Sequence, residues 1–222
     1  MPIDKTLGKD PERRAVSRAG IMATMLEQRI QQHFIDSADL KYQSAQSLSG
    51  PIAAAVQALL ACVTSGGKVL ACGNGGSAAD AQHFAAEFVG RFERERPELG
   101  AIALTTDSSI ITAIANDYDF TSIFSRQVRA LGAPGDVLLA ISTSGNSANV
   151  LAAIEAAHAR EMVVVGLSGR GGGKMTKVLR DTDVHICVPS ERTARVQEVH
   201  ILALHCMCDA VDAQLLGEQE TP

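Results

Sequence analysis

The sequence has no Trp, and aromatic residues make up only 4% of its 222 residues. It also lacks an excess of positive charge, because 20 Lys and Arg are outnumbered by 25 Asp and Glu, which gives a formal net charge of −5. A general nucleic-acid binder is normally basic and carries aromatic side chains for base stacking. We therefore expect no direct contact with nucleic acid.

Charged residues are also sparse, at 20%, whereas hydrophobic residues reach 46%. Such a chain is too apolar for intrinsic disorder, and it is long enough for one substantial core. The five cysteines contain no C-x-x-C pair, which argues against a zinc site made of thiolates. Their positions in apolar runs favour small core residues in a reducing compartment. They are Cys62, Cys72, Cys187, Cys206 and Cys208.

The N-terminal stretch Met1–Gly20 is polar and charged, and it has no apolar segment of the kind found in signal peptides. No apolar run in the sequence comes near the roughly 20 residues that span a bilayer. We therefore expect a cytoplasmic protein without membrane contact. Residues 1–20 are expected to form a flexible extension, and residues 21–222 a single domain.

The domain is expected to start with a helical arm over residues 21–65. Apolar residues recur at helical spacing over 22–48, and Pro51 is expected to begin a second helix that ends at Thr64. From residue 66 to 222, short apolar runs then alternate with helical segments. Strands are expected at 68–72, 101–105, 136–142, 162–167 and 184–188, and helices at 78–92, 108–116, 121–131, 148–160 and 193–216. Strands without polar alternation, separated by helices, predict an α/β fold with a parallel sheet covered on both faces.

Two loops follow predicted strands and precede helices, namely Gly73–Ser77 and Ser142–Ser147. In an open parallel sheet the ligand crevice lies beyond the carboxyl ends of the strands. Backbone N–H groups at a helix N-terminus bind anions, and the second loop adds four hydroxyl groups within six residues. Neither loop contains Lys or Arg, so the pair suits a sugar phosphate held by neutral donors. The alternative is a pair of well-capped turns without a ligand.

The first loop also fits a dinucleotide-binding pattern, because Gly73, Gly75 and Ala78 have the required spacing. In that pattern a ribose-binding acid follows about 20 residues later. The candidate here, Asp107, lies 34 positions after Gly73, which disfavours this alternative.

Two predicted helices carry candidate metal ligands. His83 and Glu87 are four residues apart, so they lie on one helix face. The last helix carries Gln197 and His205. If the two helices face each other, these four side chains provide nitrogen and oxygen ligands suited to zinc or a similar divalent ion. The alternative is that His83 and His205 are half-buried structural histidines. His33, His158 and His185 are expected to lie on the surface or to have an ordinary structural role.

The run Arg91–Arg96 carries charges of both signs. It is expected to be a solvated surface or a contact between subunits.

Four segments together resemble the phosphoheptose isomerases, enzymes of the sugar isomerase (SIS) family that act on sedoheptulose 7-phosphate. They are CGNGGSAADAQHFAAEF (72–88), ALTTDSSIITAIANDYDF (103–120), GDVLLAISTSGNSANV (135–150) and RVQEVHILALHC (195–206). The resemblance covers residues 25–218. It implies a flavodoxin-like α/β/α sandwich, a homotetramer and a cytoplasmic role in making the heptose of bacterial surface polysaccharide such as lipopolysaccharide.

The resemblance also implies roles for particular residues. Glu87 and His205 would be the catalytic acid/base pair, and one zinc ion per subunit would be held by His83, Glu87, Gln197 and His205. The substrate would contact Glu87, Gln197 and residues of three further segments: Asn74, Gly75, Gly76, Ser77, Asn116, Asp117, Ser142, Thr143, Ser144 and Ser147.

Two other functions remain open. The DnaA initiator-associating protein DiaA, a regulator of replication, is similar in fold and sequence, including the segments FERERP (92–97) and QVRALG (127–132). It departs from the catalytic pattern at the positions of Glu87 and His205, which are both intact here, so the resemblance favours the enzyme. A contact with DnaA is expected only if the chain also acts like that regulator. The third possibility is a SIS-domain isomerase for an arabinose or hexulose phosphate.

Overall fold

The computed structural model describes residues 11–217, with side chains from Met22 onward. The chain forms two compact units, Met1–Asp39 and Leu40–Pro222. Of the expected flexible extension, residues 1–10 lie outside the described residues, and residues 11–20 are helical.

Helix α1 runs without a break over Pro11–Thr64, so the prediction of two helices separated at Pro51 is wrong. Proline disfavours a helical residue before it, mainly through a clash with the Cβ of that residue. The residue before Pro51 is Gly50, which has no Cβ. This part of the steric penalty is therefore absent.

The second unit contains a five-stranded parallel sheet in the order β2-β1-β3-β4-β5. The strands are β1 (Val69–Gly73), β2 (Ala101–Ala103), β3 (Val137–Ile141), β4 (Val163–Ser168) and β5 (Val184–Cys187). Every residue of β1 and β3 is buried, as expected for strands covered on both faces. All five predicted strands are confirmed, with small shifts of their ends.

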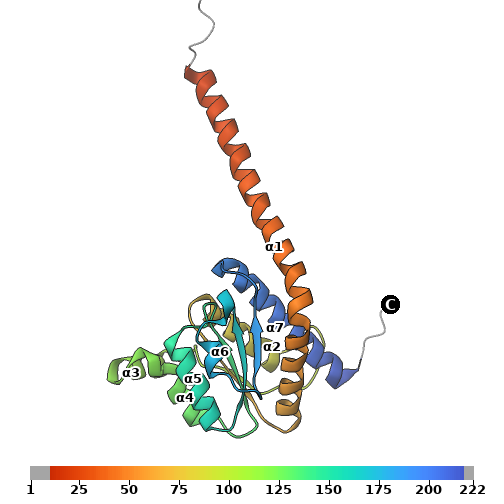
Figure 1. The fold of residues 1–222 in the computed structure, drawn as a ribbon, viewed down its shortest axis with the longest axis vertical. Coiled ribbons are helices and arrows are strands. Elements are labelled where there is room, and N and C mark those ends of the chain that lie inside the picture. The colour runs from red at the N-terminus through yellow and green to blue at the C-terminus, as the bar shows by residue number, and fades with distance from the viewer. Residues whose placement is uncertain (1–10, 218–222) are drawn as a thin grey trace, which may run out of the picture. The chain divides into compact units, whose positions relative to one another are not determined.

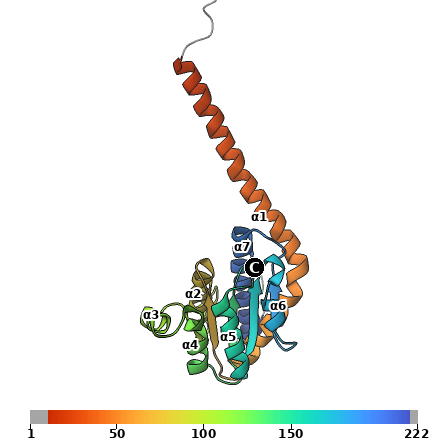
Figure 2. The same ribbon diagram turned by 60° about the vertical axis from the view of Figure 1, so that its left-hand side comes forward.

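Helices cover both faces of the sheet (Figures 1 and 2). They are α2 (Gly76–Val89), α3 (Ser108–Asp117), α4 (Ile123–Leu131), α5 (Ala148–Ala159), α6 (Met175–Val178) and α7 (Thr193–Leu216), with short 3-10 turns at Phe120–Ser122 and Arg170–Gly172. The end of α1 packs with α2 and α7 on one face, and α4 and α5 pack on the other. The predicted three-layer α/β/α fold is therefore confirmed.

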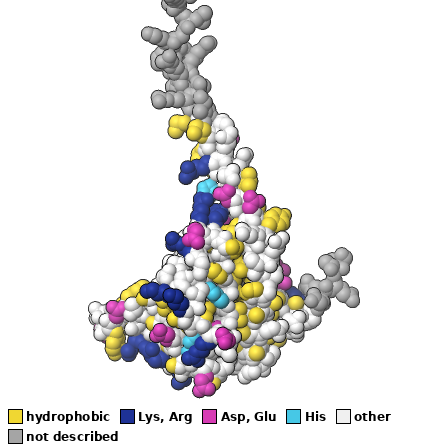
Figure 3. Space-filling view, viewed as in Figure 1, with side chains coloured by type: hydrophobic (Ala, Val, Ile, Leu, Met, Phe, Trp, Pro, Cys, Tyr) yellow, Lys and Arg dark blue, Asp and Glu magenta, His cyan; other side chains and the backbone are white. Residues whose placement is uncertain are grey.

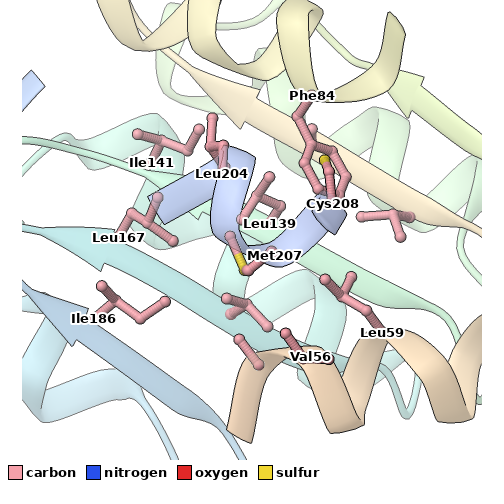
Figure 4. Close-up of a cluster of buried hydrophobic side chains, with 14 of the residues drawn as sticks. Val56, Leu59, Phe84, Leu139, Ile141, Leu167, Ile186, Leu204, Met207 and Cys208 are labelled. Carbon is pink, nitrogen blue, oxygen red and sulfur yellow. The ribbon is translucent and has the colours of Figure 1, made fainter. Parts of the chain in front are cut away.

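Helix α7 lies at the centre of one of the two cores (Figure 4). Its Leu204, Met207 and Cys208 are fully or almost fully buried against strand side chains such as Leu139 and Leu167. Strand side chains alternate between the two cores, so that Leu139 lies in this one and Leu138 in the other. This packing fixes which face of α7 points towards α2.

Two helical stretches, Met22–Thr64 and Thr193–Leu216, are long and apolar enough to cross a membrane by length and composition alone. These stretches differ from the expectation that no apolar run comes near the length of a bilayer span. The core helix of a soluble protein passes the same test, and nine residues of α7 are buried inside this fold. Its apolar character is thus explained by packing. On the face seen in Figure 3, acidic and basic side chains are interspersed, in keeping with the absence of a net positive charge.

Candidate active site

The two predicted loops lie side by side at the carboxyl end of the sheet. The register pairs Gly73, at the end of β1, with Ile141, at the end of β3. The order β2-β1-β3-β4-β5 reverses direction between these strands, because β2 lies on one side of β1 and the later strands on the other. Such a switch point is where open α/β sheets bind ligands.

The first loop turns sharply into α2 at Gly75, whose φ is +55° and ψ is −120°. A side chain would be strained in this conformation. The N–H of Ser77 donates to the carbonyl of Asn74 at 3.0 Å, and Ser77 itself is buried. No side chain among the described residues caps the start of α2. The N–H of Ala78 likewise donates to the carbonyl of Gly75 at 3.0 Å, so among the described residues the N–H groups left for an anion at this helix N-terminus are those of Gly75 and Gly76.

The second loop is organised by its own hydroxyl groups. Ser142 Oγ and Ser147 Oγ are 2.9 Å apart, and Ser144 Oγ accepts from the N–H of Asn146 at 3.2 Å. Ser142 is buried, whereas Thr143, Ser144 and Ser147 are half-buried. Helix α5 begins after Ser147, again without a side-chain cap from the described residues. The loop thus brings together hydroxyl groups and a second helix N-terminus.

A glycine-rich loop after β4, residues 169–173, packs against the second loop and helps to hold its backbone in place. Gly169 N donates to the carbonyl of Thr143 at 3.0 Å, and Met175 N donates to the carbonyl of Gly145 at 2.9 Å. Gly145 has a φ of +64°, and a Cβ there would collide with the carbonyl of Gly172. Gly171, Gly172 and Gly173 also have positive φ, and this run of three glycines was the available signal in the sequence of a close backbone approach.

Asn149 is a site residue that sequence analysis missed. Its side chain exchanges two hydrogen bonds with that of Asn74, with Nδ2–Oδ1 distances of 2.9 and 2.8 Å. The pair joins the first loop to the first turn of α5, and Asn149 is only 3% exposed. A buried amide without such a partner would be costly. Because the partners are 75 residues apart, no local pattern could have paired them.

The structure brings three of the predicted ligands together on α2 and α7. His83 Nε2 lies 2.9 Å from His205 Nε2 and 3.3 Å from Glu87 Oε1. The side chains of His83 and Glu87 are 41% and 21% exposed, so solvent and ligands reach them. Phe92 packs beside His205, with their ring centroids 5.5 Å apart.

The fourth predicted ligand, Gln197, lies at the start of the same helix pair. Its amide packs against Gly76, where any side chain would collide with the amide nitrogen. Gly76 lies seven residues before His83 on α2, and its contact Gln197 lies eight residues before His205 on α7. Helices α2 and α7 thus run parallel, with matching residues opposite each other.

The orientation of α7 is also fixed by His200, which is fully buried. His200 Nε2 lies 3.0 Å from the carbonyl of Ser168, at the end of β4. Burial lowers the pKa of His200 to about 4, although the bond to the Ser168 carbonyl opposes the shift. His200 is therefore neutral near pH 7, and it ties α7 to the carboxyl end of the sheet.

Asp80 lies three residues before His83, and sequence analysis did not single it out. Burial raises its pKa to about 6, against the opposing charge of His83. Its Oδ2 is buried without a hydrogen-bond partner among the described residues. The signal in the sequence was its helical spacing from His83, three residues on.

The donor types at His83, Glu87 and His205 fit zinc, which binds imidazole nitrogen and carboxylate oxygen. Two nitrogens on one tetrahedral zinc ion lie about 3.3 Å apart, so the imidazole rings would have to separate by about half an ångström. In their present positions, no group of three or more His, Cys, Asp or Glu among the described residues could hold a metal ion. The zinc site stays a prediction, supported by donor type and proximity.

A shallow pocket of about 180 Å³ adjoins the first loop. Asn74, Gly75, Thr105 and Phe120 are among its lining residues. Asn116 and Asp117, two predicted substrate contacts, lie exposed at the end of α3 and bond to each other, with Nδ2 and Oδ1 2.8 Å apart. Asp107, the candidate ribose-binding acid of the dinucleotide alternative, caps α3 by accepting from the N–H of Ile110 at 2.9 Å.

Comparisons with known proteins agree with this geometry. The SIS domain family matches residues 32–169. A phosphoheptose isomerase of Methylibium petroleiphilum is 75% identical over 196 residues, which are 88% of this chain and 98% of that protein. The solved phosphoheptose isomerase of Neisseria gonorrhoeae has 55% identity and a TM-score of 0.81, covering 85% of this chain and 99% of that one. That of Francisella tularensis has 46% identity and a TM-score of 0.81, covering 83% and 97%.

Proposed function

The chain belongs to the phosphoheptose isomerases of the SIS-domain family and is an isomerase, and we propose that it converts sedoheptulose 7-phosphate to D-glycero-D-manno-heptose 7-phosphate. The observation that carries this proposal is the convergence of His83, Glu87 and His205 beside two loops built for an anion. An isomerase for another sugar phosphate would need the same machinery, so the substrate is the part that needs testing.

The phosphate group of the substrate would bind at the second loop. Ser142, Thr143, Ser144 and Ser147 provide hydroxyl donors there, and the start of α5 provides backbone N–H groups. A phosphate would replace the contact between Ser142 Oγ and Ser147 Oγ. The sugar would then extend past Asn74, Gly75, Gly76 and Ser77 towards the helix pair, where Gln197 is also placed to contact it. Asn116 and Asp117 are retained as candidate contacts from α3.

The reaction moves a proton from C1 of the ketose to C2 of the aldose, and a second proton from the C1 hydroxyl to the C2 oxygen. An enediol lies between the two. One group must take the carbon-bound proton, and another must supply a proton to oxygen. Glu87 and His205 are proposed as this acid/base pair. His83 lies between them in the group, within 3.3 Å of both, and holds their side chains in one small region.

We further propose that His83, Glu87, Gln197 and His205 hold one zinc ion per subunit. Bound zinc would supply Lewis acidity towards the carbonyl and hydroxyl oxygens of the substrate. The residues themselves would orient the sugar and carry the protons.

The proposal includes a homotetramer in the cytoplasm that acts in the synthesis of surface-polysaccharide heptose. Six large apolar side chains are exposed on the first unit, and a contact with other subunits would cover them: Met22, Met25, Leu26, Ile30, Phe34 and Ile35. Light scattering of the purified protein tests the tetramer. A contact with DnaA stays a prediction from resemblance alone.

The test is a turnover assay with sedoheptulose 7-phosphate, with and without added zinc, followed by NMR of the product. Formation of the aldose heptose 7-phosphate is expected, together with loss of activity on chelation that zinc reverses. Arabinose and hexulose phosphates form the comparison set. Faster turnover of one of them would show that the proposed substrate is wrong. Activity that chelation leaves unchanged would refute the proposed role of zinc.

A further inference from the structure

A buried ion pair joins α7 to the segment that follows α2. Arg96 Nε lies 2.6 Å from Asp212 Oδ1, and the two side chains are only 1% and 2% exposed. This differs from the sequence expectation that Arg91–Arg96 is a solvated surface or a contact between subunits. Arg91 meets that expectation, with an exposed ion pair to Glu95, whereas Arg96 turns inward.

Arg96 also donates hydrogen bonds to the last turn of α2. Its Nη2 donates to the carbonyl of Glu87 at 2.7 Å, and its Nη1 donates to the carbonyl of Phe88 at 2.9 Å. These carbonyls lie near the end of α2, where helical partners run out. One guanidinium thus bonds directly to the backbone of Glu87, the proposed catalytic carboxylate.

Asp212 connects the same guanidinium to the other side of the site. It lies seven residues, or about two turns, after His205, so both residues are on one face of α7. Cys208 lies between them in the sequence. Burial is the main cause that raises the pKa of its thiol, and the nearby negative charges of Glu87 and Asp212 raise it further. Glu87, Arg96, Cys208 and Asp212 therefore lie close together between α2 and α7.

Stability alone is a weak reason for this pair. A buried ion pair must offset the loss of hydration of both charges, and well-packed apolar residues are often as stable. Asp212 Oδ2 moreover has no hydrogen-bond partner among the described residues. What an apolar pair could not do is hold the Glu87 carbonyl at a fixed distance from α7.

We propose that Arg96 and Asp212 are positioning residues that fix Glu87 opposite His205 by clamping the end of α2 to α7. This inference rests on the proposed function, because it gives the clamp a role in the chemistry of Glu87 and His205. Neither residue touches the substrate loops, so the clamp acts on the chemical step and leaves binding of the phosphate group intact.

The test compares Asp212→Asn and Arg96→Lys with Asp136→Asn. Asp136 belongs to a second ion pair, with Lys68, at the opposite end of the sheet. The two Asp→Asn substitutions each break an ion pair, and Arg96→Lys keeps the charge but loses the guanidinium bonds to the Glu87 and Phe88 carbonyls. Each is expected to lower Tm by about 10 °C. The double variant Arg96→Met with Asp212→Leu removes both charges and should recover much of that loss. All kinetics are measured well below the lowest Tm.

The clamp predicts a kcat about tenfold to a hundredfold lower in Asp212→Asn, Arg96→Lys and the double variant, with KM within twofold of the unsubstituted protein. Asp136→Asn should keep its kcat despite a similar loss of Tm. If the clamp variants keep kcat, or if they lose it only as much as Asp136→Asn does, the positioning role is wrong. If none of them folds, the pair is a stability element and the proposal is also overturned.

A second readout keeps this result separate from the proposed function. The imidazole ¹⁵N signals of His83 and His205 report their contact directly, whichever sugar phosphate is the substrate. They should shift in Asp212→Asn and stay in place in Asp136→Asn. Absence of turnover by the unsubstituted protein would refute the proposed function, whereas unshifted imidazole signals would refute the clamp.

Discussion

The two ends of the parallel sheet use polar residues in opposite ways. At the amino end, Asp136 accepts from the N–H of Lys68 and that of Ala133, both at 2.9 Å, and pairs with the Lys68 ammonium. At the carboxyl end, the hydroxyls of Ser142 and Ser147 contact each other, and so do the imidazole nitrogens of His83 and His205. A substrate can replace such contacts, whereas the carboxylate of Asp136 is already held by three bonds from Lys68 and Ala133.

The difference shows how one scaffold separates stability from chemistry. Polar groups at the amino end are satisfied by the chain itself and hold β1 to β3. Polar groups at the carboxyl end are held in place by others, such as Asn149 and Arg96, so that their functional atoms stay available. Substitutions at the two ends should therefore change different quantities.

The comparison predicts its largest effect at Glu87. Glu87→Gln removes the proposed acid/base group and should lower kcat by about a thousandfold. The fold should persist, because the side chain is partly exposed and its backbone bonds are unchanged. Turnover and circular dichroism check both points, with exposed Glu155→Gln as the matched control. Activity above a tenth of that of the unsubstituted protein would show that Glu87 is not the acid/base group of the reaction.

Asp136→Asn should give the reverse result at the amino end. Loss of this carboxylate is expected to cost about 3 kcal/mol of unfolding free energy and to leave kcat unchanged. Denaturant titration measures the first quantity and the turnover assay the second. A fall in kcat at temperatures where the variant is folded would show that the two ends are not independent.

The pH dependence of this variant sharpens the prediction. Burial alone would raise the pKa of Asp136, but the hydrogen bonds from Lys68 and Ala133, together with the charge of Lys68, outweigh burial and lower it. The carboxylate therefore stabilises the fold fully above its unfolded pKa of about 3.9, and this contribution is lost as the pH falls through the lower folded pKa. The stability difference between the two proteins should be constant near neutral pH and shrink in acid.

Ser142→Ala tests the phosphate loop. The substitution removes one hydroxyl donor to a charged group, and it should raise KM about tenfold to thirtyfold with a smaller effect on kcat. Exposed Ser109→Ala serves as the control. Inorganic phosphate should also inhibit this variant less than the unsubstituted protein. An unchanged KM would place the phosphate elsewhere.

Asn149→Ala should have the smallest effect of the four. It leaves Asn74 without its two amide bonds, so the first loop loses its link to α5, and KM should rise about fivefold. Gln127→Ala is a matched control, because Gln127 is another buried amide, and it bonds the carbonyls of Leu104 and Ile123 rather than either loop. An equal rise in KM for both variants would mean that general loosening, rather than the link, is responsible.

Patterns within single segments predicted much of the fold. Unbroken apolar runs indicated the buried parallel strands, and α7 was predicted with its observed bounds of 193–216. The proline signal at Pro51 wrongly predicted a helix boundary. The preceding residue, Gly50, has no Cβ to clash with the proline ring, so the helix continues through it. The two loops were recognisable because glycine and serine follow directly after apolar strands.

The contacts that complete the site were beyond such patterns. The Asn74–Asn149 pair and the Arg96–Asp212 pair join residues 75 and 116 positions apart. Arg96 lies in a run whose alternating charges suggested solvent, and only the tertiary fold turns it inward. His83 and His205 were named as ligands from the sequence, but their meeting depended on which faces of α2 and α7 oppose each other.

The most direct measurement of the central claim is proton transfer at the carboxyl end of the sheet. The unsubstituted protein is incubated with sedoheptulose 7-phosphate in ²H₂O, and the product is analysed by NMR. We predict a heptose 7-phosphate that carries deuterium at C2, because a carbon-bound proton passes through solvent-accessible Glu87 or His205. Glu87→Gln should form this product about a thousandfold more slowly. Product formed by Glu87→Gln at an unchanged rate, or no isomerisation by the unsubstituted protein, would contradict the account.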